Sequence, residues 1–267
     1  MYLPFHVRPR ELEPAVRAIR ALGLHGLNVT IPHKETIVPF MDRLSPEARV
    51  CGAVNTIEVS GGGSSRKLIG HNTDGLGFLA AYHEQVAGRA GGQAKSRVAG
   101  RQAILLGAGG AARAIAAGLA REGIGRLVLV NRTVARAEAL RTDLSRSFRR
   151  LSLDILPLHR LASETTAPDI FINATPLGMT GHPPLPLPRA LLRKEKARRI
   201  VVCDVVYAPD ITPLLRAARA AGAMTVNGAV MLLHQAALAF EIWTRHRAPL
   251  AAMRAALPIA HRRNTHE

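Results

Sequence analysis

The segment Gln102–Arg113 constrains the fold of this chain most strongly. It runs from an apolar stretch typical of a buried strand into the small residues Gly107, Gly109 and Ala112, and a helix is expected to begin directly after the glycines. This G-x-G-x-x-G/A spacing permits a tight turn and a close backbone approach to a pyrophosphate, which the exposed amides of the new helix attract. We interpret the segment as a dinucleotide-binding turn. A glycine-rich turn that binds nothing is the alternative.

The chain after the glycines completes one βαβ unit of the size that dinucleotide-binding folds use. A helix is predicted over Ala111–Glu122 and a strand over Arg126–Val130, which ends at Asn131-Arg132-Thr133. A site selective for NAD usually carries Asp or Glu there, about 20 residues past the glycines. This chain instead offers Arg132 and Arg136, whose planar guanidinium groups suit a phosphate, so NADP is the predicted cofactor. A solvated basic helix face is the alternative interpretation of these arginines.

The composition indicates an ordinary globular protein with an unusual charge. The 267 residues suit two domains better than one, and 36 Lys and Arg against 19 Asp and Glu give a formal net charge of +17. Such an excess attracts anionic ligands or nucleic acid. The arginines are mostly scattered, however, and aromatic residues make up only 4% of the chain, which disfavours base stacking. We therefore expect no nucleic-acid partner, and we interpret the clusters Ser145–Arg150 and Arg193–Arg199 as solvated helix faces.

The cysteine, histidine and hydropathy patterns narrow the class further. Cys51 and Cys203 are far apart in the sequence and fit small buried side chains in a reducing compartment. The eleven histidines show no spacing typical of a metal site, so no metal is expected. Met1–Arg10 lacks the apolar core of a signal peptide, and no run is long enough to cross a bilayer. These observations predict a cytoplasmic, soluble protein with no membrane partner.

Helical and strand-like patterns alternate along the rest of the chain. The segments predicted before the glycine loop are a short strand Tyr2–Val7, a helix Pro9–Leu22, a buried strand Leu27–Pro32, helical residues from there to Pro46, a strand pair Ala53–Val59 and Lys67–Gly70 around the loop Gly61–Ser65, and a helix Leu76–Val86. Gly88–Gly100 has the composition of a polar linker and marks the expected domain boundary. The segments predicted after the unit are helices Ala135–Phe148, Pro213–Ala221, Ala229–Arg245 and Leu250–Ala256 and strands Asp154–Pro157, Asp169–Ala174, Ile200–Val206 and Met224–Asn227.

Short motifs spread over nearly the whole chain resemble those of the shikimate dehydrogenase family, in the family's order. They are Asn28–Lys34, Gly52–Thr56, Asn72–Gly75, Gly107–Arg113, Asn131–Thr133, Asn173–Thr175 and Met231–Gln235. The resemblance implies an α/β fold, in which a Rossmann-type NADP domain faces a second α/β substrate domain formed by the N-terminal part and the C-terminal helices. The expected bounds are 1–96 for the substrate domain, 97–227 for the NADP domain and 228–267 for the C-terminal helices. The implied reaction is the reversible, NADP-dependent conversion of 3-dehydroshikimate to shikimate in aromatic amino acid biosynthesis.

The resemblance also implies roles for individual residues. Lys34 corresponds to the lysine that handles the hydroxyl proton of the substrate, and Asp74 corresponds to its carboxylate partner. Burial favours a neutral amine whereas a nearby anion favours the ammonium, so the sequence leaves the charge of this lysine open. The residues that match substrate-binding positions are Thr30, Lys34, Asn55, Asp74, Tyr207 and Gln235. From the sequence alone, Gln235 on an apolar helix face is equally consistent with a satisfied core amide.

Three groups of residues correspond to the family's cofactor site. They are the pyrophosphate loop Gly107, Ala108, Gly109, Gly110 and Ala111; the 2′-phosphate pocket Asn131, Arg132, Thr133 and Arg136; and, beside the nicotinamide, Thr175, Val205 and Gly228. The resemblance departs from the family at the N-terminus, because family members normally begin with a strand and a serine loop that grips the substrate carboxylate. From this departure we expect reduced stability and poor shikimate binding.

Two functional hypotheses follow from these observations. The first is an NADP-dependent shikimate dehydrogenase, with a broader quinate and shikimate range as a variant and a homodimer as a possible assembly. The second is a non-catalytic NADP-binding paralogue that keeps the cofactor loop without a competent substrate site. Retention of both Lys34 and Asp74 favours the enzyme, and absence of the serine loop favours the paralogue.

Overall fold

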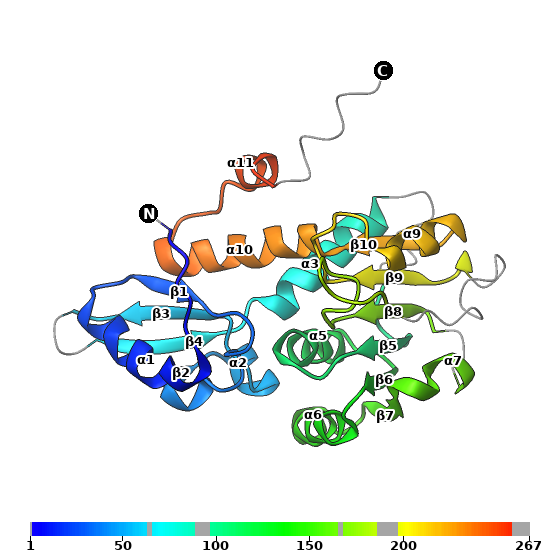
Figure 1. Ribbon diagram of the computed structural model, residues 1–267, viewed down its shortest axis with the longest axis horizontal. Coiled ribbons are helices and arrows are strands. Elements are labelled where there is room, and N and C mark those ends of the chain that lie inside the picture. The colour runs from blue at the N-terminus through cyan, green and yellow to red at the C-terminus, as the bar shows by residue number, and fades with distance from the viewer. Residues whose placement is uncertain (1, 63–65, 89–96, 165–167, 186–196, 258–267) are drawn as a thin grey trace.

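The computed structural model describes residues 2–62, 66–88, 97–164, 168–185 and 197–257 and forms two sheets from them (Figure 1). The predicted linker Gly88–Gly100, the loop Gly61–Ser65 and the basic cluster Arg193–Arg199 lie partly outside these residues, as does the end of the chain from residue 258.

The larger sheet has six strands in the order β10-β9-β8-β5-β6-β7, and every neighbouring pair is parallel. Its strands are β5 Gln102–Leu106, β6 Arg126–Asn131, β7 Ser152–Pro157, β8 Ile170–Asn173, β9 Val201–Asp204 and β10 Met224–Asn227. The central strands are almost continuously apolar because helices cover both of their faces. This strand order is that of the doubly wound Rossmann fold, which places a ligand crevice at the carboxyl ends of β5 and β8, where the direction of winding reverses. The predicted Rossmann-type unit is confirmed.

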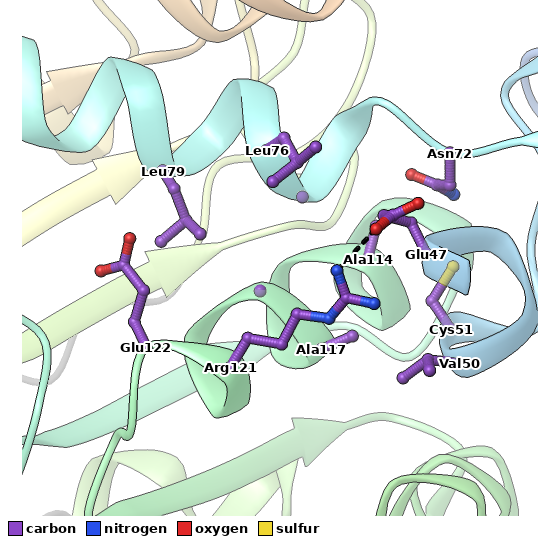
Figure 2. Close-up of a pocket in the computed structure, with 12 residues that line it drawn as sticks. Glu47, Val50, Cys51, Asn72, Leu76, Leu79, Ala114, Ala117, Arg121 and Glu122 are labelled. Atoms are coloured by element: carbon purple, nitrogen blue, oxygen red, sulfur yellow. Dashed lines mark hydrogen bonds and ion pairs between the residues drawn. The ribbon is translucent and has the colours of Figure 1, made fainter. Parts of the chain in front are cut away.

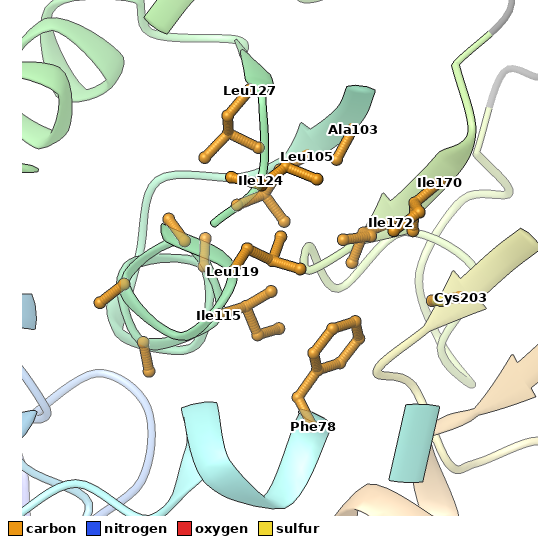
Figure 3. Packing of buried hydrophobic residues seen from close by; sticks show 14 of the residues in the cluster. Phe78, Ala103, Leu105, Ile115, Leu119, Ile124, Leu127, Ile170, Ile172 and Cys203 are labelled. Carbon is orange, nitrogen blue, oxygen red and sulfur yellow. The ribbon is translucent and has the colours of Figure 1, made fainter. Parts of the chain in front are cut away.

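Two layers of helices cover this sheet. The helices assigned to this half of the chain are α5 Gly110–Arg121, α6 Val134–Ser147, α7 Leu161–Glu164, α9 Pro213–Ala220 and the 3-10 turn η4 Leu158–Arg160. On one face, Ile115 and Leu119 of α5 pack between the strands and Phe78 of α3, which spans Asp74–Ala87 (Figure 3). On the other face, Leu214 and Leu215 of α9 join a second cluster with the sheet.

The smaller sheet has four strands in the order β1-β3-β4-β2. They are β1 Gly26–Asn28, β2 Arg43–Leu44, β3 Thr56–Ser60 and β4 Lys67–His71, with short helices η1 Pro9–Glu11, α1 Leu12–Ala21, η2 Val38–Phe40 and α2 Pro46–Cys51 around them. Leu12, Val16 and Ile19 of α1 recur at helical spacing and pack into the core of this unit. The predicted antiparallel pair around Gly61–Ser65 is confirmed as β3 and β4.

The C-terminal helices return to the first half of the chain, as expected. Helix α10, Gly228–Thr244, packs along α3, and α11, Leu250–Ala255, follows it (Figure 1). At the far end of α10, Trp243 Nε1 donates to the carbonyl oxygen of Ile57 in β3 at 2.9 Å. The second α/β unit therefore combines N-terminal residues with the end of the chain.

Three local predictions are wrong. Tyr2–Val7 forms no strand in the described residues, and the strand predicted over Leu27–Pro32 is only β1, because the chain turns at Thr30 and Pro32 has no amide to donate. The residues from Lys34 to Pro46 are not one helix. They form turns, η2 and β2, since Pro39 interrupts any regular helix there.

Helices α2, α3 and α5 meet at the seam between the two units around a pocket of about 180 Å³ (Figure 2). At the crossing of α3 and α5, a Cβ on Gly75 would lie 2.5 Å from the carbonyl oxygen of Ala114, so only glycine permits this approach. An ion pair between Arg121 Nη1 and Glu47 Oε1, 2.6 Å long, joins α5 to α2. Neither of the predicted catalytic side chains, Lys34 and Asp74, lines this pocket.

Candidate active site

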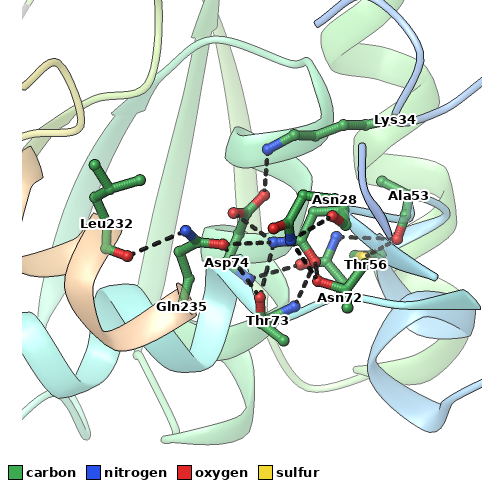
Figure 4. A network of polar contacts seen from close by, with 11 residues as sticks. Asn28, Lys34, Ala53, Thr56, Asn72, Thr73, Asp74, Leu232 and Gln235 are labelled. Carbon is green, nitrogen blue, oxygen red and sulfur yellow. Dashed lines mark hydrogen bonds and ion pairs between the residues drawn. The ribbon is translucent and has the colours of Figure 1, made fainter. Parts of the chain in front are cut away.

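Lys34 and Asp74 form an ion pair within the second α/β unit, with Nζ 2.7 Å from Oδ2 (Figure 4). Lys34 lies in the turn after β1, where its carbonyl oxygen accepts a hydrogen bond from the amide of Val54 at 2.7 Å. Asp74 is the first residue of α3. The side chains are only 16% and 5% exposed, so water screens this pair less than a surface pair. The structure thus brings together the two residues predicted to be catalytic.

Asn55 connects this ion pair to its surroundings. Its Nδ2 donates to Asp74 Oδ1 at 2.9 Å and to Thr73 Oγ1 at 2.8 Å, and it lies 3.4 Å from Gln235 Oε1. Its Oδ1 accepts from the amide of Thr73 at 2.8 Å and from Thr56 Oγ1 at 3.0 Å. Because the carboxylate of Asp74 is held on both oxygens, its orientation toward Lys34 is fixed.

Gln235 reaches the cluster from α10. The close approach of α10 to α3 requires glycine at position 77, since a Cβ there would lie 2.8 Å from the backbone nitrogen of Gln235. Gln235 Nε2 donates to the carbonyl oxygen of Leu232 at 3.1 Å, and its Oε1 lies 3.5 Å from Thr73 Oγ1. The side chain therefore lies against Asn55 and Thr73, which fits a site residue better than an isolated core amide.

Two members of the cluster were not predicted as site residues. Thr73 contacts Asn55 and Gln235 through its hydroxyl, and Asn72 Oδ1 accepts from the amide of Asp74 at 3.0 Å. Asn72 Nδ2 also donates to the carbonyl oxygen of Ala53 at 2.9 Å. The signal was present in the sequence, because small polar residues directly before a helix bind its first amides.

Thr30 and Tyr207, both predicted to touch the substrate, are exposed. Thr30 lies in the turn before Lys34, where its carbonyl oxygen accepts from the amide of His33 at 2.9 Å. Tyr207 is 52% exposed and follows β9. The hydrogen-bonded cluster in the described part of the chain does not include either hydroxyl, so their roles stay predictions.

The loop between β5 and α5 has the geometry of an anion site. Gly107 has a φ of +110°, and a Cβ there would lie 2.9 Å from the carbonyl oxygen of Ala174, so this turn requires glycine. Gly109 caps α5 without a side-chain hydrogen bond, and the first turn of α5 carries no acidic residue. The amides of Gly110 and Ala111 are therefore suited to a pyrophosphate, and Ala108 within the loop is buried. The residues present fit the phosphates of a dinucleotide.

Cationic side chains flank this loop at the end of β6. Arg132 lines a hollow of about 370 Å³ together with His159 and Leu158. Arg136 Nη2 forms an exposed ion pair with Glu35 Oε1 at 3.0 Å. Asn131 Nδ2 donates to the carbonyl oxygen of Thr133 at 2.7 Å and shapes the turn that carries the arginines. Arg136 lies beside the phosphate loop, since a Cβ on Gly109 would be 4.0 Å from its Nη2, and Arg132 lies beside the residues that follow β7.

Thr175, Val205 and Gly228 lie just past the carboxyl ends of β8, β9 and β10, on the other side of the loop. A Cβ on Gly107 would lie 3.4 Å from Thr175 Cγ2, and one on Gly228 would collide with the carbonyl oxygen of Val205. Their loops rest on a buried polar group that sequence reasoning missed, formed by Asn173, Asp204 and Thr212. An acidic residue within the predicted apolar strand Ile200–Val206 was its one signal.

The described residues contain no group of three or more His, Cys, Asp or Glu side chains that could hold a metal ion. Burial raises the pKa of the Cys51 thiol to about 11, so this cysteine has little thiolate to act as a nucleophile.

Among the described residues, no helix combines the length and apolar character needed to cross a membrane.

A doubly wound dinucleotide unit, facing a second α/β unit that presents a half-buried lysine paired with a buried carboxylate, defines a two-domain dinucleotide-dependent oxidoreductase. Family models match along most of the chain: the shikimate dehydrogenase substrate binding domain at residues 1–57, shikimate / quinate 5-dehydrogenase at 90–229, and the shikimate 5′-dehydrogenase C-terminal domain at 228–257. The chain belongs to the shikimate dehydrogenase family.

Similar proteins support this membership. Shikimate dehydrogenase (NADP(+)) of Rubrobacter xylanophilus is 45% identical over 258 residues, which cover 96% of this chain and 84% of the relative. The crystal structure of shikimate 5-dehydrogenase from Listeria monocytogenes with shikimate and NAD is 35% identical, with a TM-score of 0.78 and coverage of 95% and 84%. Quinate dehydrogenase from Corynebacterium glutamicum with NAD is 32% identical, with a TM-score of 0.78 and coverage of 91% and 80%.

Proposed function

We propose that this chain is an NADP-dependent shikimate dehydrogenase, which interconverts 3-dehydroshikimate and shikimate in aromatic amino acid biosynthesis. The observation that carries the proposal is the Lys34 and Asp74 ion pair, 2.7 Å long, beside the phosphate loop. The stem of Lys34 lies against Gly110, where a Cβ would be 2.7 Å from the Cβ of Lys34. A proton-handling group therefore lies next to the cofactor loop, as a hydroxyl oxidation requires.

Lys34 is assigned the proton transfer at the hydroxyl that is oxidised. Its amino group contacts Asp74 through one hydrogen, which leaves its other positions for a substrate oxygen. The ammonium form donates a proton when 3-dehydroshikimate is reduced, and the neutral amine accepts that proton when shikimate is oxidised. Asp74 is assigned a positioning role toward Lys34 and a contact with a substrate hydroxyl. This division fits the geometry, because Asn55 fixes the second oxygen of Asp74.

The remaining polar side chains are assigned to substrate recognition. Asn55, Gln235 and Thr30 offer uncharged donors and acceptors, which suit a small polyhydroxylated acid, and Tyr207 is assigned to its carboxylate. Thr73 joins this set, because its hydroxyl lies within 3.5 Å of Gln235 Oε1. An analogue that lacks a hydroxyl would leave a buried polar group of such a site without a hydrogen bond, so it would bind less tightly.

NADP is the cofactor that the residues fit, and when bound it supplies the hydride chemistry. Gly107, Ala108, Gly109, Gly110 and Ala111 are assigned to its pyrophosphate. Asn131, Arg132, Thr133 and Arg136 are assigned to its 2′-phosphate, and Thr175, Val205 and Gly228 to its nicotinamide. Similarity to the shikimate dehydrogenase (NADP(+)) of Rubrobacter xylanophilus supports this choice over NAD.

We propose the domain bounds 1–96, 97–227 and 228–267 together with this function. The two sheets and the contact of α10 with α3 support this division. From the sequence composition and the family resemblance, we also propose that the protein is cytoplasmic and forms a homodimer.

A wider substrate range that includes quinate is the second candidate. It is favoured by the similarity to quinate dehydrogenase from Corynebacterium glutamicum at 32% identity. Quinate and shikimate are both hydroxylated ring acids, so the uncharged donors around Asp74 suit either one. A non-catalytic paralogue is disfavoured, because the structure retains a complete lysine and carboxylate pair.

The test is the rate of cofactor reduction by the purified chain with four pairs: shikimate or quinate, each with NADP or NAD. We expect turnover with shikimate and NADP, and at least about a tenfold lower kcat/KM with NAD, because only NADP engages the arginines. Comparable rates with quinate would establish the wider range. Binding of NADP without turnover on any pair would contradict the enzyme and support the paralogue.

A further inference from the structure

Asn173 and Asp204 form a buried pair where β8 and β9 end. The two residues are direct register partners in the parallel sheet, and they are 0% and 2% exposed. Asn173 Nδ2 donates to Asp204 Oδ1 at 2.9 Å. A side-chain bond between the last residues of two strands ties together the loops that follow them.

Asn173 holds the loop after β8. Its Oδ1 accepts from the backbone amide of Thr175 at 3.1 Å and from Thr175 Oγ1 at 2.6 Å. Its Nδ2 also donates to the carbonyl oxygen of Leu177 at 3.0 Å. The position and the rotamer of Thr175 therefore depend on Asn173.

Asp204 holds the loop after β9. Its Oδ1 accepts from the amide of Val206 at 3.1 Å, and its Oδ2 accepts from Thr212 Oγ1 at 2.6 Å. Thr212 also caps α9, because its Oγ1 accepts from the amide of Leu215 at 3.2 Å. Asp204 therefore fixes the path of the chain on both sides of Val205 and connects it to a helix.

The choice of a carboxylate at this position is notable because burial raises the pKa of Asp204 to about 6. Above that pH the folded protein keeps a charge in a place that disfavours charge. An uncharged pair of similar shape would satisfy a purely structural role at lower cost. The carboxylate, however, accepts three donors at once, which an amide in its place does not.

We propose that Asp204, through Asn173 and Thr212, is a positioning residue that sets the two loops between which the nicotinamide ring binds. The inference rests on the proposed function, in which Thr175 and Val205 lie beside that ring. Asp204 is buried and acts through the loops, so it is not itself a contact of the substrate. The alternative is a satisfied polar core residue that contributes stability alone.

The test compares Asp204→Asn with a matched control, Asp169→Asn. Asp169 precedes β8 at the opposite end of the sheet, where its Oδ2 accepts from the amide of Gln102 at 2.9 Å. In a second pair of variants, Thr212→Val removes the hydroxyl that donates to Asp204, and Thr212→Ser keeps it. Three quantities are measured: kcat with shikimate and NADP, the enhancement of NADPH fluorescence on binding, and the dissociation constant of adenosine 2′,5′-bisphosphate, which lacks the nicotinamide.

For Asp204→Asn we expect kcat to fall about tenfold or more, because small misplacements at a reacting centre are costly. The fluorescence enhancement falls with it, while adenosine 2′,5′-bisphosphate binds as before. Thr212→Val is expected to lower kcat and the fluorescence enhancement in the same way, whereas Thr212→Ser keeps both at the level of the unaltered chain. Asp169→Asn leaves all three quantities unchanged. Unchanged kcat and fluorescence in both Asp204→Asn and Thr212→Val would overturn the proposal, as would an equal loss of adenosine 2′,5′-bisphosphate binding.

The two proposals fail in different ways. If the unaltered chain binds NADPH but does not oxidise shikimate, the proposed function is wrong, and the fluorescence readout still decides the role of Asp204. If the unaltered chain is active and Asp204→Asn retains its activity and fluorescence, only the positioning role is wrong.

Discussion

The aliphatic stem of Lys34 packs directly against Gly110, the first residue of α5. A Cβ on Gly110 would lie 2.7 Å from the Cβ and 3.0 Å from the Cδ of Lys34. The same lysine reaches Asp74 with its amino group. One side chain thus connects the phosphate loop to the polar cluster on α3, and its position depends on the absence of a side chain at residue 110.

The substitution Gly110→Ala is therefore expected to displace Lys34. A Cβ at that distance forces the stem or the loop to move, and a shift of about 1 Å at a catalytic group costs on the order of 10²-fold in rate. Steady-state kinetics with shikimate and NADP measure the loss. Gly62→Ala is the control, because a Cβ there has no heavy atom within 4 Å. Equal rates for Gly110→Ala and Gly62→Ala would contradict a functional role for the contact between Lys34 and Gly110.

The ion pair between Arg136 and Glu35 makes a prediction about cofactor choice. Arg136→Gln is expected to weaken NADP binding about tenfold and to leave NAD binding unchanged, because only NADP carries a 2′-phosphate. Glu35→Gln is expected to tighten NADP binding about two- to fivefold, since an exposed ion pair that competes for Arg136 is worth only about 0.2–1 kcal/mol. Isothermal titration with both cofactors measures these constants. A Glu35→Gln effect that persists in the Arg136→Gln background would contradict this competition.

Arg113 provides a prediction about the seam between the units. Its guanidinium is buried, donates from Nε to the carbonyl oxygen of Cys51 at 2.6 Å and pairs with Asp143. Arg113→Met keeps most of the packing but removes these donors, so we expect a loss of about 1–3 kcal/mol in the free energy of unfolding. Arg121→Met, which removes the more exposed pair with Glu47, is expected to cost about 0–1 kcal/mol. Urea denaturation measures the free energy of unfolding of both variants. An equal loss in Arg113→Met and Arg121→Met would contradict a larger stabilising role for the buried arginine.

Asp204 gives the unfolding free energy a pH dependence of known sign. Burial raises its pKa from an ordinary 3.8 to about 6, so its stabilising contribution is complete below pH 3.8 and is lost as the pH rises through 6. The stability of the unaltered chain relative to Asp204→Asn should fall by about 3 kcal/mol between about pH 4 and pH 7. Denaturant titrations of both proteins across this range test it. A difference that stays constant with pH, or that rises, would contradict the raised pKa.

The sequence was sufficient where local patterns determine the structure. Continuous apolar runs such as Leu105 and Leu106 before Gly107 are typical of buried parallel strands, and glycine spacing sets the turn that follows. Lys34 and Asp74 were also predicted as a pair, because their motifs match a known family in order. The distance between them along the chain made the contact invisible to local reasoning alone.

The sequence was insufficient where a role arises from tertiary contact. Asp204 lies within the strand predicted over Ile200–Val206, and only the register of β8 and β9 shows that it meets Asn173. Thr73 similarly gains its role from α10, which brings Gln235 to it from the far end of the chain. The strand predicted over Tyr2–Val7 was wrong because an extended pattern does not supply a pairing partner.

The most direct measurement of the proposed function is shikimate-dependent reduction of NADP by the unaltered chain and by Lys34→Ala, with Lys67→Ala as a control on an exposed lysine of β4. We expect kcat of Lys34→Ala to fall by about 10²- to 10⁴-fold, because general acid and base catalysis contributes that much. NADP binding should persist in Lys34→Ala, and Lys67→Ala should match the unaltered chain. Turnover by Lys34→Ala within tenfold of the unaltered chain would contradict the assignment of proton transfer to the Lys34 and Asp74 pair.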